Sequence, residues 1–309
     1  MKQVSVVIPV FEDAACLKDL TRAFTRVEEK LKPKQVELEY IFIDDGSADE
    51  TWQTLKALKE DKNNITLIKL SRNFGAVAAS NAGMKYVTGE AFTIYAADMQ
   101  DPPELVLTMV DKWLKGYKHI ICQRNSQRKD PIPTKVFASI YYRLVKFLLI
   151  PDYPKNGFDI MFWDSQFLPL IRDTSKNINR SLYAHWLGVK PFIIQYNRPE
   201  RGYGTSKWSM SKKIKLFIDS FLGFSIAPMR IAVTIGVLGA LLSFLYGVKV
   251  AIGALLGKVA VPGYASTIII MSFLFSIVIG MLGVIGEYIW RIFDELNKRP
   301  ESVIEEIIK

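Results

Sequence analysis

The sequence predicts an α/β domain with a doubly wound, mostly parallel sheet, followed by an amphipathic helix and two membrane-spanning helices. Two observations lead to this fold class. In the first part of the chain, short runs rich in β-branched residues alternate with segments of helical hydrophobic spacing. Towards the end, two long stretches contain no charged residue. The chain has 309 residues, of which 50% are hydrophobic, and much of that hydrophobic excess lies in these two stretches.

Strands and helices are expected in strict alternation. The expected strands cover residues 4–10, 38–43, 65–70, 91–96, 119–123 and 192–196. The expected helices cover residues 14–31, a segment through Leu55 and Leu58, and residues 76–86, 102–114 and 135–150. Strands separated by helices form a parallel sheet with helices on both faces. Ligands of such sheets bind at the carboxyl ends of the strands, near the switch in strand order.

The uncharged stretches, residues 231–248 and 259–286, are each long enough to cross roughly 30 Å of hydrocarbon as a helix. Residues 212–224 place apolar side chains on one face and lysines at the start, which indicates a helix at the membrane interface; an ordinary surface helix is the alternative. We therefore expect a catalytic domain at 1–211, a juxtamembrane helix at 212–228, a two-helix membrane domain at 229–290 and a C-terminal tail at 291–309.

Orientation follows from the charges that flank the spans. Basic residues precede the first span and follow the second, so both termini and the catalytic domain are expected in the cytoplasm, on a multi-pass protein of the inner or plasma membrane. The N-terminus has no features of a signal peptide. Glycines in both spans, including Gly253 and Gly257, favour close helix packing and a homo-oligomer. Cys16 and Cys122 are expected to be reduced core residues.

The net charge of +9 is concentrated in two basic clusters, around residues 124–146 and 201–215. Such clusters beside a span suit phosphates or anionic lipid head groups. A solvated basic face and nucleic-acid binding are the alternatives. Because the second cluster leads directly into a span, we expect membrane lipids and phosphates, and no nucleic acid, as partners.

The sharpest chemical motif follows the strand at 91–96. There, Asp98 and Gln100 offer two oxygen ligands for Mg²⁺ or Mn²⁺, whose other positions phosphate and water would fill. The alternative is that Asp98 and Asp101 only cap the helix that starts at the prolines. Asp44 and Asp45 close another strand and can accept hydrogen bonds from a nucleoside, although a plain strand-to-helix turn would have the same sequence.

Four blocks in order, together with a basic segment and the two spans, resemble family 2 glycosyltransferases. The blocks are residues 6–11, 43–51, 70–75 and 97–104, and the basic segment is 198–208. The nearest resemblance is to the polyprenyl-phosphate glycosyltransferase branch, which includes dolichol-phosphate mannose synthase and the bactoprenol glucosyl transferases. It implies a GT-A fold and inverting transfer from a nucleotide-sugar, UDP-glucose or a related UDP-hexose, to undecaprenyl or dolichyl phosphate, for glycan or O-antigen modification.

The resemblance also implies roles for individual residues. The nucleoside would be held by Pro9, Phe11, Asp13, Asp44 and Asp45, with Arg72 and Asn73 in the third block. Asp98 and Gln100 would hold the metal. The lipid phosphate or donor diphosphate would meet Arg124, Arg128, Arg201, Ser206 and Lys207. Asp159 matches an acidic position near the sugar.

The chain departs from the family pattern in two places. Glu12 and Asp13 stand where the family usually has Asn-Glu, and Ala96 stands where it usually has an acid. Ala96 is the one feature that favours a different class of protein, a catalytically inactive membrane scaffold of a glycan pathway. A processive polysaccharide synthase is disfavoured because the chain lacks a Gln-x-x-Arg-Trp segment and further spans. Only His119 and His185 are present, and neither lies in a motif, so both are expected to be structural.

Overall fold

The computed structural model describes residues 1–125, 132–154, 157–174, 178–197, 210–256 and 263–309. The chain divides into two compact units. The first contains Met1–Leu216 together with Pro300–Lys309, and the second contains Phe217–Arg299. The last ten residues therefore belong to the N-terminal unit, although the whole second unit separates them from it in the sequence.

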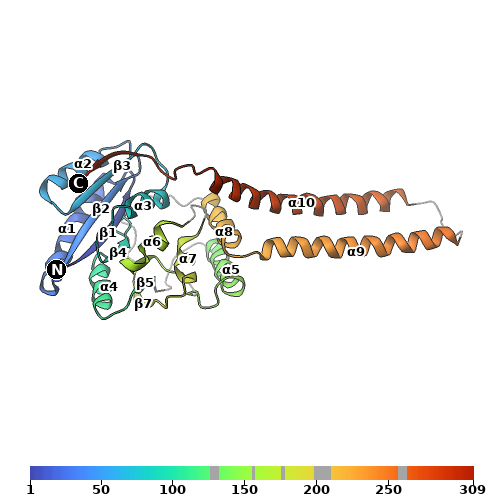
Figure 1. Cartoon of the computed structure of the whole chain (residues 1–309), viewed down its shortest axis with the longest axis horizontal. Helices are drawn as coiled ribbons and strands as arrows, with labels where there is room; N and C mark the ends of the chain where they lie inside the picture. The colour runs from blue at the N-terminus through green and yellow to red at the C-terminus, as the bar shows by residue number, and fades with distance from the viewer. Residues whose placement is uncertain (126–131, 155–156, 175–177, 198–209, 257–262) are drawn as a thin grey trace. The chain divides into compact units, whose positions relative to one another are not determined.

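The first unit alternates strands and helices as expected (Figure 1). Its strands are β1 Lys2–Val10, β2 Val36–Asp44, β3 Ile65–Leu70, β4 Ala91–Ile94, β5 His119–Arg124, β6 Ile160–Asp164, β7 Phe192–Tyr196 and β8 Ile304–Ile308. Its helices are α1 Ala14–Leu31, α2 Thr51–Asp61, α3 Ala76–Met84, α4 Glu104–Leu114, α5 Ile132–Leu148, α6 Leu168–Arg172 and α7 Arg180–Trp186, with 3₁₀ turns at Lys32–Lys34 and Ser165–Phe167. Helix α8, Met210–Phe224, leads from the first unit into the second.

The eight strands form one sheet in the order β7-β5-β6-β4-β1-β2-β3-β8. Strands β3, β2, β1 and β4 are parallel, and β5 pairs in parallel with β7. Strand β6 runs antiparallel between β4 and β5, and β8 runs antiparallel along β3. This is the mostly parallel α/β sheet of GT-A type that the sequence predicts. The sequence analysis missed the two antiparallel strands, β6 and β8.

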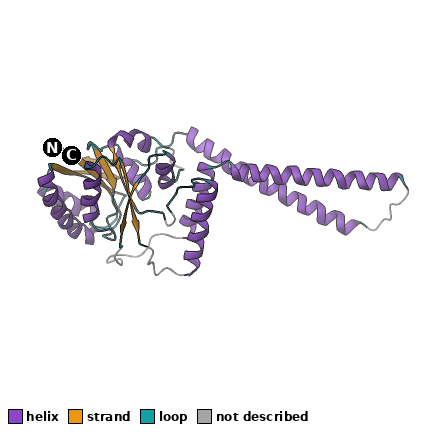
Figure 2. Ribbon diagram, turned by 90° about the horizontal axis from the view of Figure 1, so that it is seen from below, coloured by secondary structure: helices purple, strands orange, loops and turns teal. Residues whose placement is uncertain are grey.

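Helices cover both faces of the sheet, as a doubly wound sheet requires (Figure 2). Alternate residues of β1 point to opposite faces. Val4, Val6 and Ile8 join the core under α1, α2 and α4, whereas Val7 joins the core under α3, α6 and α7. The carboxyl ends of β1, β2, β3 and β4 consequently meet at one edge, with the reversal of strand order between β1 and β4.

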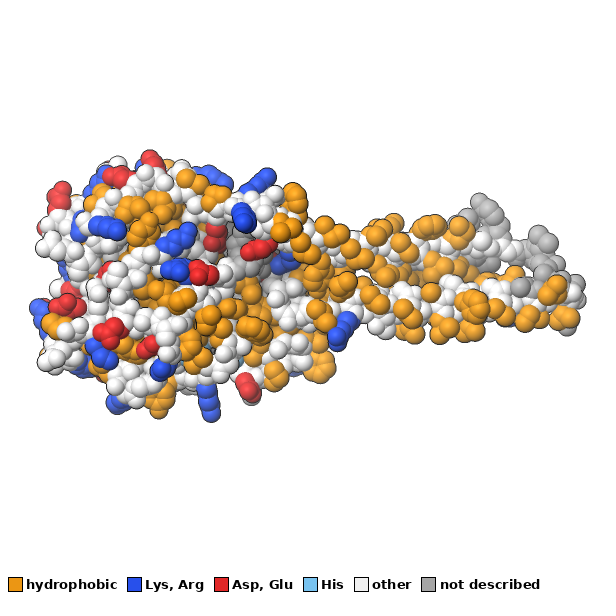
Figure 3. Space-filling model, in the orientation of Figure 1, with side chains coloured by type: hydrophobic (Ala, Val, Ile, Leu, Met, Phe, Trp, Pro, Cys, Tyr) orange, Lys and Arg blue, Asp and Glu red, His pale blue; other side chains and the backbone are white. Residues whose placement is uncertain are grey.

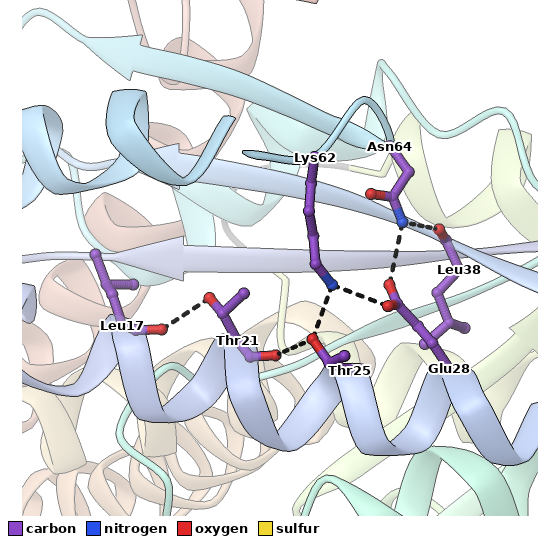
Figure 4. Close-up of polar contacts among 7 residues, drawn as sticks. All are labelled: Leu17, Thr21, Thr25, Glu28, Leu38, Lys62 and Asn64. Carbon is purple, nitrogen blue, oxygen red and sulfur yellow. Dashed lines mark hydrogen bonds and ion pairs between the residues drawn. The ribbon is translucent and has the colours of Figure 1, made fainter. Parts of the chain in front are cut away.

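A polar network at the opposite edge fastens α1 to the turn before β3 (Figure 4). Glu28 accepts hydrogen bonds from the Lys62 ammonium at 2.9 Å and from the Asn64 amide at 3.1 Å. Lys62 also donates to Thr25, and Asn64 to the backbone carbonyl of Leu38. The side chains of Lys62 and Glu28 are only 20% and 19% exposed, so solvent screens their attraction less than it screens a surface pair.

We therefore expect Glu28→Ala to lower the free energy of unfolding by about 1–3 kcal/mol, because two donors lose their charged acceptor. Arg22→Ala on the same helix is the matched control, since the Arg22–Asp19 pair is exposed and such pairs contribute roughly 0–1 kcal/mol. Thermal unfolding of the detergent-solubilised protein measures both. Equal unfolding temperatures for the two variants would contradict this role for Glu28.

The second unit consists of two long apolar helices, α9 Ala227–Leu255 and α10 Tyr264–Leu296, which contact each other. Hydrophobic side chains cover the visible face of both helices (Figure 3). Each contains a segment long and apolar enough to cross a membrane, Ala227–Val250 and Phe273–Leu296, and neither segment is buried within the protein. The chain is therefore suited to membrane anchoring through these helices.

Helix α10 continues past residue 286, where the uncharged stretch of residues 259–286 ends. Beyond that stretch lie Glu287 and Arg291, which form an ion pair at 3.1 Å one helical turn apart. Arg291 also pairs with Asp219 at 2.7 Å, and Tyr288 donates to the backbone carbonyl of Ser225. Pairing of these charges explains why an apolar helix continues past the first charged residue, and it fastens the end of α8 to the last turns of α10.

Candidate functional site

The carboxyl ends of β1 and β2 are joined to each other. The Asp45 amide donates to the Val10 carbonyl at 2.9 Å, and Pro9 lies one residue earlier in β1. Asp44 is fully buried, and its Oδ1 accepts from the Ser47 amide at 3.0 Å. The other oxygen, Oδ2, has no hydrogen-bond partner among the described residues. A buried carboxylate oxygen without a donor is an acceptor for a ligand N–H or hydroxyl.

Asp45 holds the loop that follows β3. Its two oxygens accept from the backbone amides of Phe74 at 2.7 Å and Gly75 at 2.8 Å. Burial raises the pKa of Asp45, and these two hydrogen bonds oppose the rise. Gly46 has a φ of +68°, and a Cβ there would lie 2.4 Å from the backbone carbonyl carbon of Arg72. The loop therefore rests directly against the backbone of the β2 turn, where a glycine is required.

The same loop presents two residues of the expected nucleoside site. Arg72 and Asn73 are exposed, and the Arg72 guanidinium lies 4.3 Å from the centre of the Phe74 ring. Asp45 thus acts on the site through the loop as well as by its own position. Each of its oxygens keeps a second lone pair, so direct contact with the nucleoside stays a prediction.

The turn after β1 is fastened to the turn after β2. Glu12 donates its amide to the Ser47 hydroxyl at 2.9 Å, and Asp13 donates its amide to the Thr51 hydroxyl at 3.2 Å. The Asp13 carboxylate accepts from the Phe11 amide at 3.4 Å. Glu12 adopts a φ of +52°, which is uncommon for a residue with a Cβ and occurs where surrounding contacts impose it. Phe11 and Asp13 are both half-buried beside the Asp44 turn.

The expected metal ligands lie in a tight turn after β4. Asp98 is half-buried, and its Oδ1 accepts from the Gln100 amide at 3.2 Å. Met99, between them, has a φ of +53°, a second left-handed residue at this edge. Ala96 is exposed. No group of three or more histidine, cysteine or acidic side chains that could hold a metal occurs in the described part of the chain. One carboxylate and one amide fit only a cation whose other ligands come from substrate and water.

A hydrogen-bonded network extends from this turn to β5, β6 and β7. Arg124 donates to both carboxylate oxygens of Asp159, from Nε to Oδ2 at 2.9 Å and from Nη2 to Oδ1. The Tyr196 hydroxyl lies 2.5 Å from Asp101 Oδ1 and 3.2 Å from Asp159 Oδ2. Asp101 is buried, and its backbone carbonyl accepts from the Tyr95 hydroxyl. Asp101 is thus a support for the Asp98 turn, and it links that turn to Asp159.

Charge supports this network. Burial opposes the charge of Arg124, but the hydrogen bond and attraction of Asp159 outweigh burial and raise the pKa of the Arg124 guanidinium. Sequence reasoning did not find Tyr196 or the supporting role of Asp101. The one available signal was that the expected strand at 192–196 ends on a tyrosine.

Neither histidine belongs to this edge. His119 begins β5 at the other end of the strand, stacks on Trp163 with ring centres 3.6 Å apart, and donates from Nδ1 to the Val189 carbonyl at 3.0 Å. Burial lowers the pKa of His119 to about 4. His185 lies in α7 beside the Asp152 carbonyl, and burial lowers its pKa too. Both histidines are structural.

The structure brings most of the predicted residues to one sheet edge. Those within the described residues are Pro9, Phe11, Asp13, Asp44, Asp45, Arg72, Asn73, Asp98, Gln100, Arg124 and Asp159. The predictions for Arg128, Arg201, Ser206 and Lys207 fall outside the described residues. Hydrogen-bond donors and acceptors therefore lie at the carboxyl ends of β1–β3, and the side chains of Asp98 and Gln100 lie just after the end of β4.

Comparison with known proteins identifies the family of the chain. A family model for "Glycosyl transferase family 2" matches residues 5–183. An uncharacterized glycosyltransferase of Synechocystis sp. is 31% identical over 99% of this chain and 95% of its own length. A putative glycosyltransferase of Bacillus subtilis is 32% identical over 99% of this chain and 93% of its own length. The bactoprenol glucosyl transferase of Shigella phage SfX is 30% identical over 98% of this chain and 99% of its own length.

Solved structures are more distant. A Pyrobaculum calidifontis mannosyltransferase in complex with GDP-Man and Mn²⁺ is 16% identical, with a TM-score of 0.44 over 91% of this chain and 87% of that one. A Mycobacterium tuberculosis glucosyl-3-phosphoglycerate synthase in complex with Mn²⁺ and UDP-glucose is 13% identical, with a TM-score of 0.46 over 64% and 73%. At these scores the similarity carries no inference about the ligands of this chain.

Proposed function

Because the chain belongs to glycosyl transferase family 2, we propose that it transfers a sugar from a nucleotide-sugar to a polyprenyl phosphate at the cytoplasmic face of a membrane. The donor is UDP-glucose or a related UDP-hexose, and the acceptor is undecaprenyl or dolichyl phosphate. The observation that supports this most is the combination, in one chain, of a polar sheet edge built for a nucleotide and an apolar helical hairpin. The water-soluble donor needs the polar sheet edge, and the lipid acceptor needs the apolar helices.

The donor side is supported by the unpaired oxygen of Asp44 and by the loop of residues 71–75. A buried acceptor selects a ligand that brings a donor, such as a base N–H or a ribose hydroxyl. The Arg72 guanidinium, exposed on the loop, suits an anionic ligand. In this proposal, the nucleoside lies between the β1 and β2 turns, and the diphosphate extends towards Asp98.

Asp98 and Gln100 would hold a Mg²⁺ or Mn²⁺ ion together with donor oxygens. Such an ion supplies a Lewis acid that neutralises charge on the departing diphosphate. The protein's own contribution is the shape of the turn. The left-handed Met99 and the buried Asp101 fix the direction of the Asp98 side chain before any ligand binds.

The reaction itself needs orientation more than a strong base. An oxygen of the acceptor phosphate forms a bond to the anomeric carbon, while the bond from that carbon to the diphosphate breaks. The diphosphate leaves with the electron pair, and attack from the opposite side inverts the anomeric centre. A phosphate monoester carries about −1.5 to −2 charges at pH 7, so it is already a nucleophile. In this proposal Asp159, which hydrogen-bonds to Arg124 and Tyr196, orients the sugar.

The acceptor side rests on basic residues. In this proposal Arg128, Arg201, Ser206 and Lys207 meet the lipid phosphate or the donor diphosphate. Relatives named bactoprenol glucosyl transferases support a lipid-linked acceptor. Purified protein incubated with polyprenyl phosphate and a panel of nucleotide-sugars, with the lipid product identified by mass, tests the function. If no donor yields a lipid-linked sugar, the proposed transfer is wrong and the alternative, a catalytically inactive membrane scaffold, replaces it.

We also propose that both ends of the helical hairpin lie in the cytoplasm. The first unit contains residues on both sides of the hairpin, because β8 pairs with β3. A hairpin that starts and ends in one soluble unit has to leave and return on the same side of the membrane. The basic residues flanking the hairpin make that side the cytoplasm.

A cysteine at Lys258, between the spans, is therefore expected to react with a membrane-impermeant maleimide in intact cells. A cysteine at Asp61, which is exposed in the first unit, should react only after lysis. The two native cysteines are buried and give little background. Labelling of the Asp61→Cys variant, but not of Lys258→Cys, in intact cells would mean that the topology is the opposite of the proposed one.

A further inference from the structure

The C-terminal segment, residues 301–308, contacts the start of the loop at residues 71–75 and the helix α3 that follows the loop. At the start of the loop, the Ser71 amide donates to the Val303 carbonyl at 3.0 Å. At its end the loop continues into α3, where the buried Asn81 donates its amide to the Glu301 carboxylate. Glu301 also offsets the burial of Arg180 in α7, whose pKa is lowered to about 10.

Strand β8 fixes this segment in place. It pairs with β3 from Leu67 to Leu70, with an irregular register next to Leu70 that brings Val303 opposite Ser71. Glu306 accepts from the Trp52 indole at 3.2 Å and pairs with Lys56 at 3.0 Å, both in α2. The segment therefore contacts α2, β3 and α3, the elements on either side of the loop.

The loop in turn shapes the proposed nucleotide site. Two of its amides bind Asp45, its backbone rests on Gly46, and it carries Arg72 and Asn73. A displacement of the loop would move the two exposed side chains and release the Asp45 carboxylate from its donors. Residues 301–308 would thus act on the bound nucleotide indirectly, through the residues of the loop.

We propose that residues 301–308 are a positioning element for the donor nucleotide, acting through the loop at residues 71–75. This inference rests on the proposed function, because it concerns the same nucleotide. Helix α10 ends at Leu296 and β8 begins at Ile304, so only a short connection separates the second span from this element. In the chain, the membrane hairpin is therefore connected to the proposed donor side of the site by a short segment.

Binding of UDP with Mg²⁺ to the full-length protein in detergent, measured by calorimetry, tests the proposal. Glu301→Ala is expected to weaken UDP binding by about tenfold, because a small displacement of the loop misplaces the groups that bind the nucleotide. Glu301→Gln keeps an oxygen that accepts from Asn81, so it should retain most of the affinity. Glu305→Ala is the matched control, because Glu305 pairs with Lys69 at a 51% exposed position of the same strand.

Kinetics separate positioning from a general loss of structure. In Glu301→Ala, KM for the nucleotide-sugar should rise while kcat and KM for the polyprenyl phosphate stay close to wild type. Glu306→Ala, which frees Trp52 and Lys56 without touching the loop directly, should give a smaller change in the same direction. Wild-type UDP affinity in both Glu301→Ala and Glu306→Ala would overturn the positioning role and leave the proposed function intact. Failure of the wild-type protein to bind UDP or GDP would overturn both.

Discussion

Replacement of Asp98 by alanine is expected to lower sugar transfer by at least about a hundredfold, comparable to loss of a group that stabilises charge in the transition state. In the described part of the β4 turn, Asp98 is the acidic residue proposed to bind the cation, because Asp101 is buried against Tyr196 and Ala96 has no side-chain oxygen. The loss should appear in kcat as well as in the metal concentration needed for half-maximal rate. Initial rates of lipid-linked sugar formation against Mg²⁺ and Mn²⁺ concentration measure both.

Two control variants separate charge from structure. Asp98→Asn keeps an oxygen that accepts from the Gln100 amide, so it should fold normally and still lose most of its activity. Glu104→Ala removes an exposed acid from the first turn of α4, close by in the sequence, and should leave the rate nearly unchanged. Ala96→Asp adds a carboxylate at an exposed position and should lower the half-maximal metal concentration. Wild-type rates in Asp98→Asn at every metal concentration would remove Asp98 from the metal site.

The parallel part of the fold could be predicted from the sequence because each of its elements has its own local pattern of hydrophobic residues and flanking turns. The strand at Ile65–Leu70 and the helix at Ala14–Leu31 lie where hydrophobic period and flanking turns place them. The two antiparallel strands could not be predicted in this way. Strand β6 is a short apolar run without its own period. Strand β8 follows a membrane span, and its partner β3 lies at the other end of the chain, so only tertiary pairing makes it a strand.

The site could be predicted as a set of strand ends, but not as a network. The carboxyl ends of parallel strands lie at the same edge of a sheet, independently of which side chains they carry. Asp44 and Asp98 therefore lie at the same edge. Which acids face a ligand depends on burial. Asp45 accepts hydrogen bonds from the loop, and Asp101 is hydrogen-bonded to Tyr196. No local sequence pattern distinguishes these two residues from Asp44 and Asp98 nearby. Arg124 likewise has the sequence context of a phosphate ligand but binds Asp159.

Arg124→Ala is expected to destabilise the protein by about 2–4 kcal/mol and to reduce transfer strongly, because it leaves the Asp159 carboxylate without its partner. The side chain of Asp159 is only 12% exposed, so water cannot replace the guanidinium fully. Thermal unfolding, with wild type measured in parallel, checks the loss of stability, and initial rates of lipid-linked sugar formation check the loss of transfer.

The double variant Arg124→Ala/Asp159→Asn distinguishes two roles for Arg124. If Arg124 serves to hold Asp159, the neutral asparagine no longer needs a cation and still accepts from Tyr196, so the double variant should regain most of the lost stability. Activity should stay low, because the oriented carboxylate is gone. If instead Arg124 binds the lipid phosphate directly, Arg124→Ala should raise KM for polyprenyl phosphate at unchanged stability, and the two substitutions should act additively. Additive losses of stability, with a rise in KM for polyprenyl phosphate alone, would therefore support the role that the sequence context predicts, in which Arg124 binds the phosphate.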